Sequence, residues 1–332
     1  MKKINVAIVG TTGVVGRMFL KILEERNFPI DNLYLFSSAK SKGSKIKFND
    51  KEYIVEELKE DSFNKDIQIA LFSAGGEISS KYAPIAVSKG IVVVDNSSHF
   101  RMDPNVPLVV PEVNGDEVKN HKGIISNPNC STIQAVLPLK PLHDKYKIKR
   151  IVYSTYQAVS GSGINGINDL ENGILGEDNN FYPHQIAYNC IPQIDVFVKN
   201  GYTKEEMKMI NETKKIFNDI DMNVTATTVR VPVKNCHSES INVEFEEPFD
   251  LSYLVASLEK MNGVSVIDNI EINEYPMPLN CTGKDEVFVG RIRRDFSVDN
   301  GINMWVVADN IRKGAATNAI QIAELLLKYN LV

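Results

Sequence analysis

The sequence predicts an α/β fold, in which an N-terminal Rossmann-like, doubly wound parallel sheet is followed by an α+β domain with a mixed sheet. Three observations predict it. The first third alternates short apolar runs with amphipathic helical stretches. A glycine-rich turn joins the first such run to the first helix. The second half changes to strand-like alternation, and 332 residues are long for a single core.

The elements of the first domain follow one another in a strand–helix rhythm. Residues 4–10, INVAIVG, form the first expected strand, a β-branched run that ends at a glycine. Residues 16–27 carry apolar side chains at helical spacing. Further strands are expected at 33–38, 67–76 and 91–98, and a helix at 81–90 that ends at a glycine. This order is typical of a parallel sheet with crossover helices.

The second domain shows a different pattern. Strand-like alternation is expected at 148–160, 226–233, 239–247 and 287–295, with helices at 203–219 and 250–261. The last helical stretch, 309–330, is amphipathic and is expected to return to the first domain. The expected domains are therefore 1–129 with 313–332, and 130–312.

Composition and charge exclude several classes of function. The formal net charge of −5 gives no footprint for nucleic acid. Four scattered cysteines without a C-x-x-C pair predict neither a zinc site nor a disulfide framework, and we expect no metal. The start lacks a cleavage site for a signal peptide, and no apolar run is long enough to span a bilayer. We expect a cytoplasmic protein without a membrane partner.

The turn after the first strand is a candidate dinucleotide site. Its glycines suit a tight turn, a close approach of the backbone to pyrophosphate, and helix–strand packing. The spacing is G-x-x-G-x-x-G, one residue different from the standard fingerprint. A purely structural turn is the alternative reading. The candidate cofactor-binding residues of this turn are Gly10, Thr11, Thr12, Gly13, Val14, Val15 and Gly16.

The end of the second strand indicates which dinucleotide is bound. An NAD-specific domain usually has an acidic residue there, for the ribose 2′-hydroxyl. This chain instead has Ser38 and Lys40, which suit a 2′-phosphate, so we predict NADP(H). The alternative is a solvated loop. Ser73, Ala74 and Gly75, at the end of a later strand, are assigned to the same site.

A cysteine lies at the mouth of an apolar stretch, in SNPNCSTIQAVLPL. Cys130 can begin a helix, whose amide donors and dipole would favour a thiolate nucleophile. Asn129 could donate a hydrogen bond to an oxyanion. A buried, inert cysteine is the alternative. Among five histidines, His237 lies between two strand-like runs, but the residues alone do not rank it above His99 or His184.

Several motifs together resemble the aspartate-β-semialdehyde dehydrogenase family, in its shorter Gram-positive bacterial type. They are VGTTGVVG, DNSSHFRMD, VPEVN, SNPNCSTIQ, STYQAVSGSG, VRVPVKNCHSES and DNIRKGAATNAIQIAE, in the family's order and nearly end to end. The resemblance implies that 1–129 with 313–332 bind NADP and that 130–312 form the catalytic and dimerisation domain.

The resemblance also implies roles for individual residues. Cys130 falls on the nucleophile, His237 on the acid/base and Gln157 on the glutamine that orients the substrate. Arg230 matches the arginine for the substrate carboxylate and Arg101 the arginine for phosphate. Glu212 and Lys215 match a pair that meets the substrate ammonium and phosphate; a surface ion pair is the alternative. Further implied cofactor contacts are Asn96, Ser160, Gly161, Gly163 and Asn318. Where the family often has arginine, this chain has Lys40, which pairs with phosphate as a point charge.

The implied reaction is the reversible, NADPH-dependent reduction of L-4-aspartyl phosphate to L-aspartate-4-semialdehyde through a Cys130 thioester, in lysine, threonine and methionine synthesis. The nearest alternative is N-acetyl-γ-glutamyl-phosphate reductase or another acyl-phosphate reductase. A Cys–His acyl hydrolase and a non-catalytic NADP-binding sensor are more distant ones. A homodimer or homotetramer is expected.

Overall fold

The computed structural model describes residues 3–178 and 180–332 and divides the chain into two compact units. Unit 1 comprises Met1–Pro128 and Ala315–Val332, and unit 2 comprises Asn129–Gly314. These boundaries lie within two residues of the expected domain boundaries.

The centre of unit 1 is a six-stranded sheet in which every neighbouring pair is parallel. Its strand order is β5-β2-β1-β6-β7-β8. The bounds are β1 Ile4–Val9, β2 Ile30–Ser37, β5 Glu56–Glu57, β6 Ile69–Phe72, β7 Val92–Asp95 and β8 Ile124–Ser126, and a separate hairpin pairs β3 Lys45–Phe48 with β4 Lys51–Ile54. The chain moves outward from β1 in both directions, which confirms the predicted doubly wound topology.

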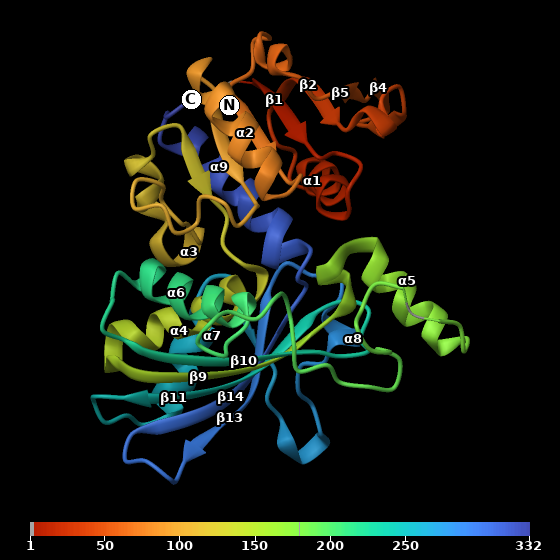
Figure 1. The fold of residues 1–332 in the computed structure, drawn as a ribbon. Coiled ribbons are helices and arrows are strands. Elements are labelled where there is room, and N and C mark those ends of the chain that lie inside the picture. The colour runs from red at the N-terminus through yellow and green to blue at the C-terminus, as the bar shows by residue number, and fades with distance from the viewer. Residues whose placement is uncertain (1–2, 179) are drawn as a thin grey trace. The chain divides into compact units, whose positions relative to one another are not determined.

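Alternate strand residues of this sheet enter two different cores. Val6 and Ile8 pack with apolar residues of α1 (Val14–Glu25) and α9 (Asn318–Lys328). Ala7 and Val9 pack instead with residues of α2 (Gly76–Ser88). Because successive side chains of a strand point to opposite faces, helices cover both sides of the sheet. Of the stretch 309–330 that was expected to return to the first domain, the part from Ala315 belongs to unit 1, with α9 beside the sheet, whereas 309–314 belong to unit 2 (Figure 1).

Unit 2 is built on a six-stranded mixed sheet of order β10-β9-β11-β14-β13-β12. The two outermost pairs, β10–β9 and β12–β13, are parallel, and the three inner pairs are antiparallel. The bounds are β9 Ile148–Gln157, β10 Asn223–Arg230, β11 His237–Phe245, β12 Val264–Val266, β13 Val287–Asp295 and β14 Gly301–Ala308. The predicted mixed sheet is thus confirmed.

One face of the second sheet is covered by helices. Three of them, α4 (Cys130–Tyr146), α6 (Lys204–Phe217) and α7 (Leu251–Glu259), lie over the same side (Figure 1). Helix α4 is buried on nearly all sides between Ser131 and Leu139, which explains its weak amphipathic pattern. The remaining helices are α3 (Pro111–Asn114), α5 (Gly163–Ile174) and α8 (Pro278–Cys281). Within the described residues, the helices are too short or too polar to cross a membrane.

Candidate active site

The glycine-rich turn of unit 1 is shaped by close backbone contacts. Gly10 has φ of 89°, and a Cβ on it would lie 2.3 Å from the carbonyl oxygen of Ser73. A Cβ on Gly16 would lie 2.2 Å from the carbonyl oxygen of Gly10. Side chains are therefore excluded where the turn meets helix α1 and where it meets the β6–α2 turn. These close contacts explain why Gly10 and Gly16 are glycines.

The N-terminus of α1 fits a phosphate group. Gly13 is the N-cap, and no side chain caps the helix there, so its first N–H groups remain accessible to an anion. Val14, Val15 and Gly16 form the first turn. Thr12 approaches the next strand, with its Oγ1 2.8 Å from Ser37 Oγ, and the buried Thr11 hydroxyl donates to Ile8 O. A phosphate of a dinucleotide could therefore be held at this helix start.

The other predicted cofactor residues of unit 1 follow the ends of neighbouring strands. Ser38 and Lys40 are exposed and lie directly beyond β2. Ser73, Ala74 and Gly75 connect β6 to α2, and Asn96 follows β7. Because parallel strands end at one edge of the sheet, these segments gather at the edge where open α/β folds bind ligands.

Three asparagines of unit 1 form a hydrogen-bonded chain around Arg101. The Nδ2 of Asn127 donates to Asn96 Oδ1 at 2.8 Å, and the Nδ2 of Asn318 donates to Asn127 Oδ1 at 2.7 Å. The guanidinium of Arg101 donates to the carbonyl oxygens of Asn127 and Asn96, at 2.9 and 3.0 Å. Asn127 thus connects two predicted cofactor contacts to the predicted phosphate-binding arginine. The sequence analysis missed it, although it lies in the same SNPNC motif.

In unit 2, Cys130 is the first residue of α4, as the sequence predicted. Asn129 is the N-cap, and its Oδ1 accepts hydrogen bonds from the backbone N–H groups of Ser131 and Thr132. A Cβ on Gly314 would lie 3.0 Å from Cys130 Cβ, so a bare backbone packs beside the thiol residue. The thiol residue is partly exposed at a helix N-terminus, the environment that favours a thiolate.

Three predicted site residues come together at one end of the second sheet. Gln157 is the last residue of β9, Arg230 the last of β10 and His237 the first of β11. Arg230 is the register partner of Gln157, and Ser238 that of Tyr156. All three side chains are buried and belong to the helix-covered face. By contrast, His99 and His184 are exposed, and neither belongs to these three strands.

The imidazole of His237 is enclosed and oriented. The backbone N–H of Ala158 donates to His237 Nδ1 at 2.9 Å, while the Ala158 carbonyl accepts from Arg230 Nη1 at 2.7 Å. Among the described residues, no group bonds to His237 Nε2, which is fully buried. Burial and the neighbouring Arg230 charge lower the pKa of His237 to about 3, and Glu205 opposes them.

Glu205, on α6, was missed by the sequence analysis. Its Oε1 accepts from Asn129 Nδ2 at 2.9 Å and from Gln157 Nε2 at 3.2 Å, and its Oε2 accepts from Lys208 Nζ at 3.0 Å. Burial alone would raise the pKa of Glu205, but the Lys208 charge and these donors lower it to about 2. Glu205 is therefore a buried carboxylate between two predicted site residues.

The predicted substrate pair on α6 divides into a buried and a half-buried member. Glu212 is 1% exposed, and its Oε2 accepts from the backbone N–H of Asn129 at 2.7 Å. Lys215 lies one turn further along the helix. The buried position of Glu212 beside Asn129 argues against the alternative of a surface ion pair.

The remaining predicted cofactor residues belong to the segment after β9. Ser160 Oγ accepts from Asn310 Nδ2 at 3.1 Å, and Gly163, with φ of 70°, begins α5. Gly161 lies against the strand-end cluster, because a Cβ on it would be 3.1 Å from Arg230 Nη1 and 3.3 Å from His237 Nε2. In the described part of the chain, no group of three His, Cys, Asp or Glu side chains could hold a metal ion.

A dinucleotide-binding unit joined to a unit with a helix-start thiol, an imidazole and an arginine defines an NAD(P)-dependent enzyme that works on an acyl group. Comparison with known proteins specifies it further. Residues 5–121 match the family model "Semialdehyde dehydrogenase, NAD binding domain", and residues 139–313 match "Semialdehyde dehydrogenase, dimerisation domain". The chain belongs to the aspartate-semialdehyde dehydrogenase family.

Individual relatives are similar to this chain over nearly their whole length. The chain is 56% identical to aspartate-semialdehyde dehydrogenase of Aquifex aeolicus and 48% identical to that of Bacillus subtilis, with 99% of each chain covered in both cases. The crystal structure of aspartate semialdehyde dehydrogenase II from Vibrio cholerae, complexed with ASA, superposes with a TM-score of 0.95 at 49% identity. That match covers 99% of both chains. The family resemblance predicted from the motifs is confirmed.

Proposed function

We propose that the chain catalyses the reversible, NADP-dependent and phosphate-dependent interconversion of L-aspartate-4-semialdehyde and L-4-aspartyl phosphate. The observation that carries the proposal is Cys130 at the N-terminus of α4, in the unit that also gathers Gln157, Arg230 and His237 at one sheet end. The end-to-end similarity to enzymes of this name supports the same substrate.

The chemistry follows from the side chains. The Cys130 thiolate attacks the aldehyde carbon in the oxidative direction and forms a hemithioacetal, whose oxidation leaves a thioester on the sulfur. NADP+, when bound, would supply the hydride acceptor for this oxidation. Phosphate then cleaves the thioester and releases the acyl phosphate and the thiolate. The covalent intermediate divides one difficult reaction into two easier ones, and biosynthesis runs them in reverse.

Four charged side chains suit the charges of the substrates. Arg230 would hold the substrate carboxylate with its planar guanidinium, and Glu212 would meet the ammonium group. Arg101 and Lys215 would bind phosphate. Gln157 would orient the substrate at Cys130, and His237 would exchange a proton with the reacting oxygen as the acid/base. The side-chain amide of Asn129 has two hydrogens, and one is donated to Glu205. The second would be donated to the reacting oxygen of the substrate.

NADP(H) is the proposed cofactor. The G-x-x-G-x-x-G turn, the bare N-terminus of α1 and the absence of an acidic residue directly after β2 support it. Asn96, Asn318 and the segment Ser160, Gly161 and Gly163 would complete the cofactor contacts. In this division, Met1–Pro128 with Ala315–Val332 would bind the cofactor, and Asn129–Gly314 would carry the chemistry and the dimer contact.

The decisive experiment is a phosphate-dependent reduction of NADP+ with L-aspartate-4-semialdehyde, run beside NAD+ and beside N-acetyl-L-glutamate-5-semialdehyde. We expect turnover with the free amino acid and dependence on phosphate. Turnover of the N-acetylated substrate alone would favour the related acyl-phosphate reductase, and hydrolysis without NADP+ would favour a hydrolase. Cofactor binding without any turnover would indicate a sensor.

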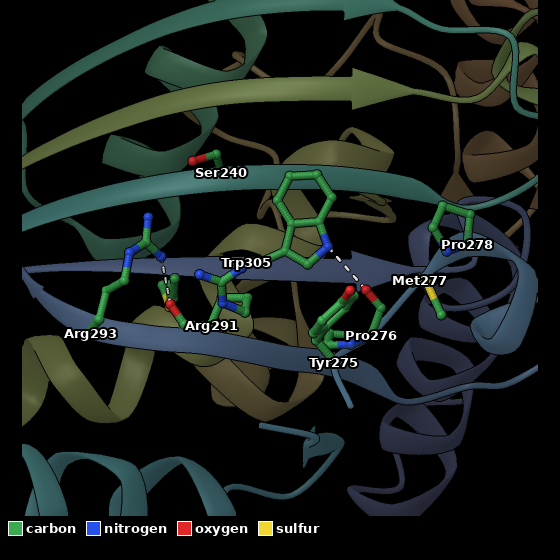
Figure 2. Close-up of a pocket in the computed structure, with 9 residues that line it drawn as sticks. Ser240, Tyr275, Pro276, Met277, Pro278, Arg291, Arg293 and Trp305 are labelled. Atoms are coloured by element: carbon green, nitrogen blue, oxygen red, sulfur yellow. Dashed lines mark hydrogen bonds between the residues drawn. The ribbon is translucent and has the colours of Figure 1, made fainter. Parts of the chain in front are cut away.

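We further propose a homodimer formed through the helix-free face of the second sheet, with a tetramer as the alternative assembly. This face carries Tyr156, which is 40% exposed, and a hollow of ≈ 320 Å³ beside Trp305. Figure 2 shows Trp305 above the strand, with its Nε1 donating to Pro276 O, and Arg291 and Arg293 nearby. Exposed aromatic side chains with arginines are typical of interfaces. Light scattering would give the mass of the assembly.

We also propose that the enzyme is of the shorter type found in Gram-positive bacteria and that it is cytoplasmic. The end-to-end similarity to the Bacillus subtilis enzyme supports the shorter type found in Gram-positive bacteria, and the Aquifex and Vibrio enzymes are similarly close. A nucleophilic thiol at Cys130 must stay reduced, which supports a cytoplasmic location. Fractionation of cells would test it.

A further inference from the structure

We propose that Asn127 is a positioning residue, whose side chain and backbone together fix how Asn96 and Arg101 face their ligands. This inference rests on the function proposed above, in which Asn96 contacts NADP(H) and Arg101 binds phosphate, and it adds a residue to which that function assigns no role. It follows from the hydrogen bonds of Asn127 within unit 1, where its side chain is fully buried.

Two backbone carbonyl groups determine how the side-chain amide of Asn127 is oriented. A carbonyl oxygen can only accept, so the nitrogen of Asn127, and not its oxygen, faces Ala315 O at 3.1 Å. The oxygen of Asn127 then faces Asn318, whose nitrogen donates to it at 2.7 Å and to Val109 O at 2.9 Å. Since Val109 O is again a pure acceptor, each of the two amides has one orientation that satisfies its partners.

The orientation of Asn127 sets that of Asn96. Asn127 Nδ2 also donates to Asn96 Oδ1, at 2.8 Å. Because this donor holds the oxygen of Asn96, the nitrogen of the same amide points away from Asn127. Asn96 is half-buried directly after β7, and among the described residues no group bonds to its Nδ2. Asn127 therefore makes Asn96 a hydrogen-bond donor toward a ligand.

The backbone of the same two asparagines holds Arg101. Its Nε donates to Asn127 O at 2.9 Å and its Nη2 to Asn96 O at 3.0 Å. The guanidinium is planar, so these two contacts fix its plane and the direction of its third nitrogen. Asn127 is itself anchored to the sheet, because its N–H donates to Asp95 O, at the end of β7, at 2.8 Å. A displacement of Asn127 would thus change the positions of Arg101 and Asn96 together.

An amide that serves packing alone is the alternative role for Asn127. The hydrogen bonds lead instead to three residues with proposed ligand contacts, Asn96, Asn318 and Arg101. The groups proposed for the chemical step belong to unit 2. Loss of the Asn127 amide is therefore expected to weaken the binding of cofactor and phosphate and to leave the chemical step intact.

The substitution Asn127→Asp tests this role. It keeps the shape of the side chain and an acceptor for Asn318, but it replaces the donor by an oxygen, so Asn96 must turn its nitrogen inward and present its oxygen to the cofactor. We expect the KM values for NADP+ and for phosphate each to rise by about tenfold or more, the cost of one hydrogen bond to a charged group. We expect kcat and the KM for the semialdehyde to stay within about threefold of wild type.

Two further variants separate orientation from charge and from folding. Asn127→Ala removes the donor without adding a charge, and it replaces Asn127→Asp in the test if that variant does not fold; we expect it to raise the same two KM values. Asn120→Asp, at an exposed asparagine of unit 1, adds the same charge elsewhere and should behave as wild type. Urea unfolding of each variant confirms that the folded protein is being compared.

A double-mutant cycle shows whether Asn127 acts through Asn96. Asn127→Asp retains the acceptor for Asn318, so its effect on cofactor binding should pass through Asn96 alone. Combined with Asn96→Ala, we expect it to raise the KM for NADP+ by no more than about threefold beyond Asn96→Ala itself. If the two single effects multiply in full, Asn127 does not position Asn96, and the inference is wrong.

The proposed function and the positioning role can fail separately. If the wild-type protein does not reduce NADP+ with the semialdehyde and phosphate, the proposed function fails. If it does, and both Asn127 variants keep the wild-type KM values for NADP+ and phosphate, the function stands and the positioning role is contradicted. A fall in stability and kcat with unchanged KM values would show that Asn127 serves packing alone.

Discussion

The side-chain amide of Asn129 donates to the buried carboxylate of Glu205 across 2.9 Å. The same Oε1 atom accepts from Gln157 Nε2, while Asn129 Oδ1 caps helix α4 and Gln157 Oε1 accepts from Thr155. Both amides therefore have a fixed orientation, with their oxygens engaged and their nitrogens toward Glu205. Since Asn129 precedes the thiol residue, Glu205 connects the position of the proposed nucleophile to that of the glutamine proposed to orient the substrate.

The substitution Glu205→Gln should lower kcat more than it changes KM. If the glutamine keeps its oxygen toward Asn129 and Gln157, its NH2 group faces the Lys208 ammonium, which then retains only Asp195 as a charge partner. Two donors therefore meet in a buried position, which disturbs the alignment of Asn129 and Gln157. We expect a fall in kcat of about tenfold or more and a loss of about 1–3 kcal/mol in the free energy of unfolding. Steady-state kinetics and urea unfolding measure both. Glu171→Gln, in an exposed pair with Lys234, is the matched control and should change neither.

The same carboxylate makes stability depend on pH. The pKa of Glu205 in the folded state, about 2, lies below its ordinary value of 4.5, so its contribution to stability is present above pH 4.5 and is lost as the pH falls toward 2. Wild type should therefore lose stability in this acid range more steeply than Glu205→Gln. Chemical unfolding at a series of pH values tests this, and parallel curves for the two proteins would argue against an ionised Glu205.

The substitution Cys130→Ala should abolish turnover and leave NADPH binding intact. In the proposed mechanism the thiol forms the covalent intermediate, and alanine suits the first turn of a helix, so the fold is retained. Turnover and NADPH fluorescence titration give the two results. Cys190→Ala, at an exposed cysteine, should behave as wild type. Near-normal phosphate-dependent activity in Cys130→Ala would contradict the thioester mechanism.

The substitution Arg230→Lys should weaken binding of the amino-acid substrate although the charge is kept. One guanidinium nitrogen of Arg230 already donates to Ala158 O, and the planar fork leaves other donors for a carboxylate; an ammonium group offers no such fork. We expect KM to rise by about tenfold or more, the cost of one charged hydrogen bond. Arg150→Lys on the exposed part of β9 is the control. Unchanged kinetic constants in Arg230→Lys would exclude this role.

The sequence predicted the features that local patterns determine. The turn at Gly10, Gly13 and Gly16 and the helix start at Cys130 depend on residues within a few positions, and both are found. The motif order was sufficient to predict the family. Strand β14, in the middle of the second sheet, was not predicted, because Val306 and Val307 are both buried and the expected alternation is lost.

The residues that the sequence did not reveal act across long separations. Glu205 is 76 positions from Asn129 and 48 from Gln157, and no local pattern marks it beyond the start of a helix. The hydrogen bond to the His237 ring comes from a backbone N–H 79 positions away. Such contacts arise from the pairing of strands and the packing of helices, so local sequence patterns do not predict them.

Cofactor preference should depend on Lys40. It is exposed directly beyond β2, where NAD-specific domains have an acidic residue, whereas the nearby Lys42 is paired with Glu57. Lys40→Glu would repel a 2′-phosphate and could accept from a 2′-hydroxyl. We expect kcat/KM for NADP+ to fall by about tenfold or more relative to NAD+. Lys51→Glu, exposed on β4, is the control for the change in net charge. If the ratio of kcat/KM for NADP+ to that for NAD+ did not change, the 2′-phosphate would be recognised by other residues.

Two glycines of the glycine-rich turn are expected to have different roles, Gly16 in helix packing and Gly13 in the approach of the cofactor. A Cβ on Gly16 would lie 2.2 Å from Gly10 O, so Gly16→Ala forces the helix away from the turn and should cost about 1–3 kcal/mol of stability. Gly13 has an ordinary φ of −72°, and its Cβ would lie 3.4 Å from Gly10 O, so Gly13→Ala should stay within about 0.5 kcal/mol of wild type.

Gly13→Ala should nevertheless bind NADPH more weakly. A methyl group at the N-cap of α1 stands where the pyrophosphate must approach the helix N–H groups. Urea unfolding gives the stability of each variant, and NADPH titration gives its affinity for the cofactor. We expect stability to fall mainly in Gly16→Ala. Tight NADPH binding in a stable Gly13→Ala would show that the dinucleotide does not approach the chain at this turn.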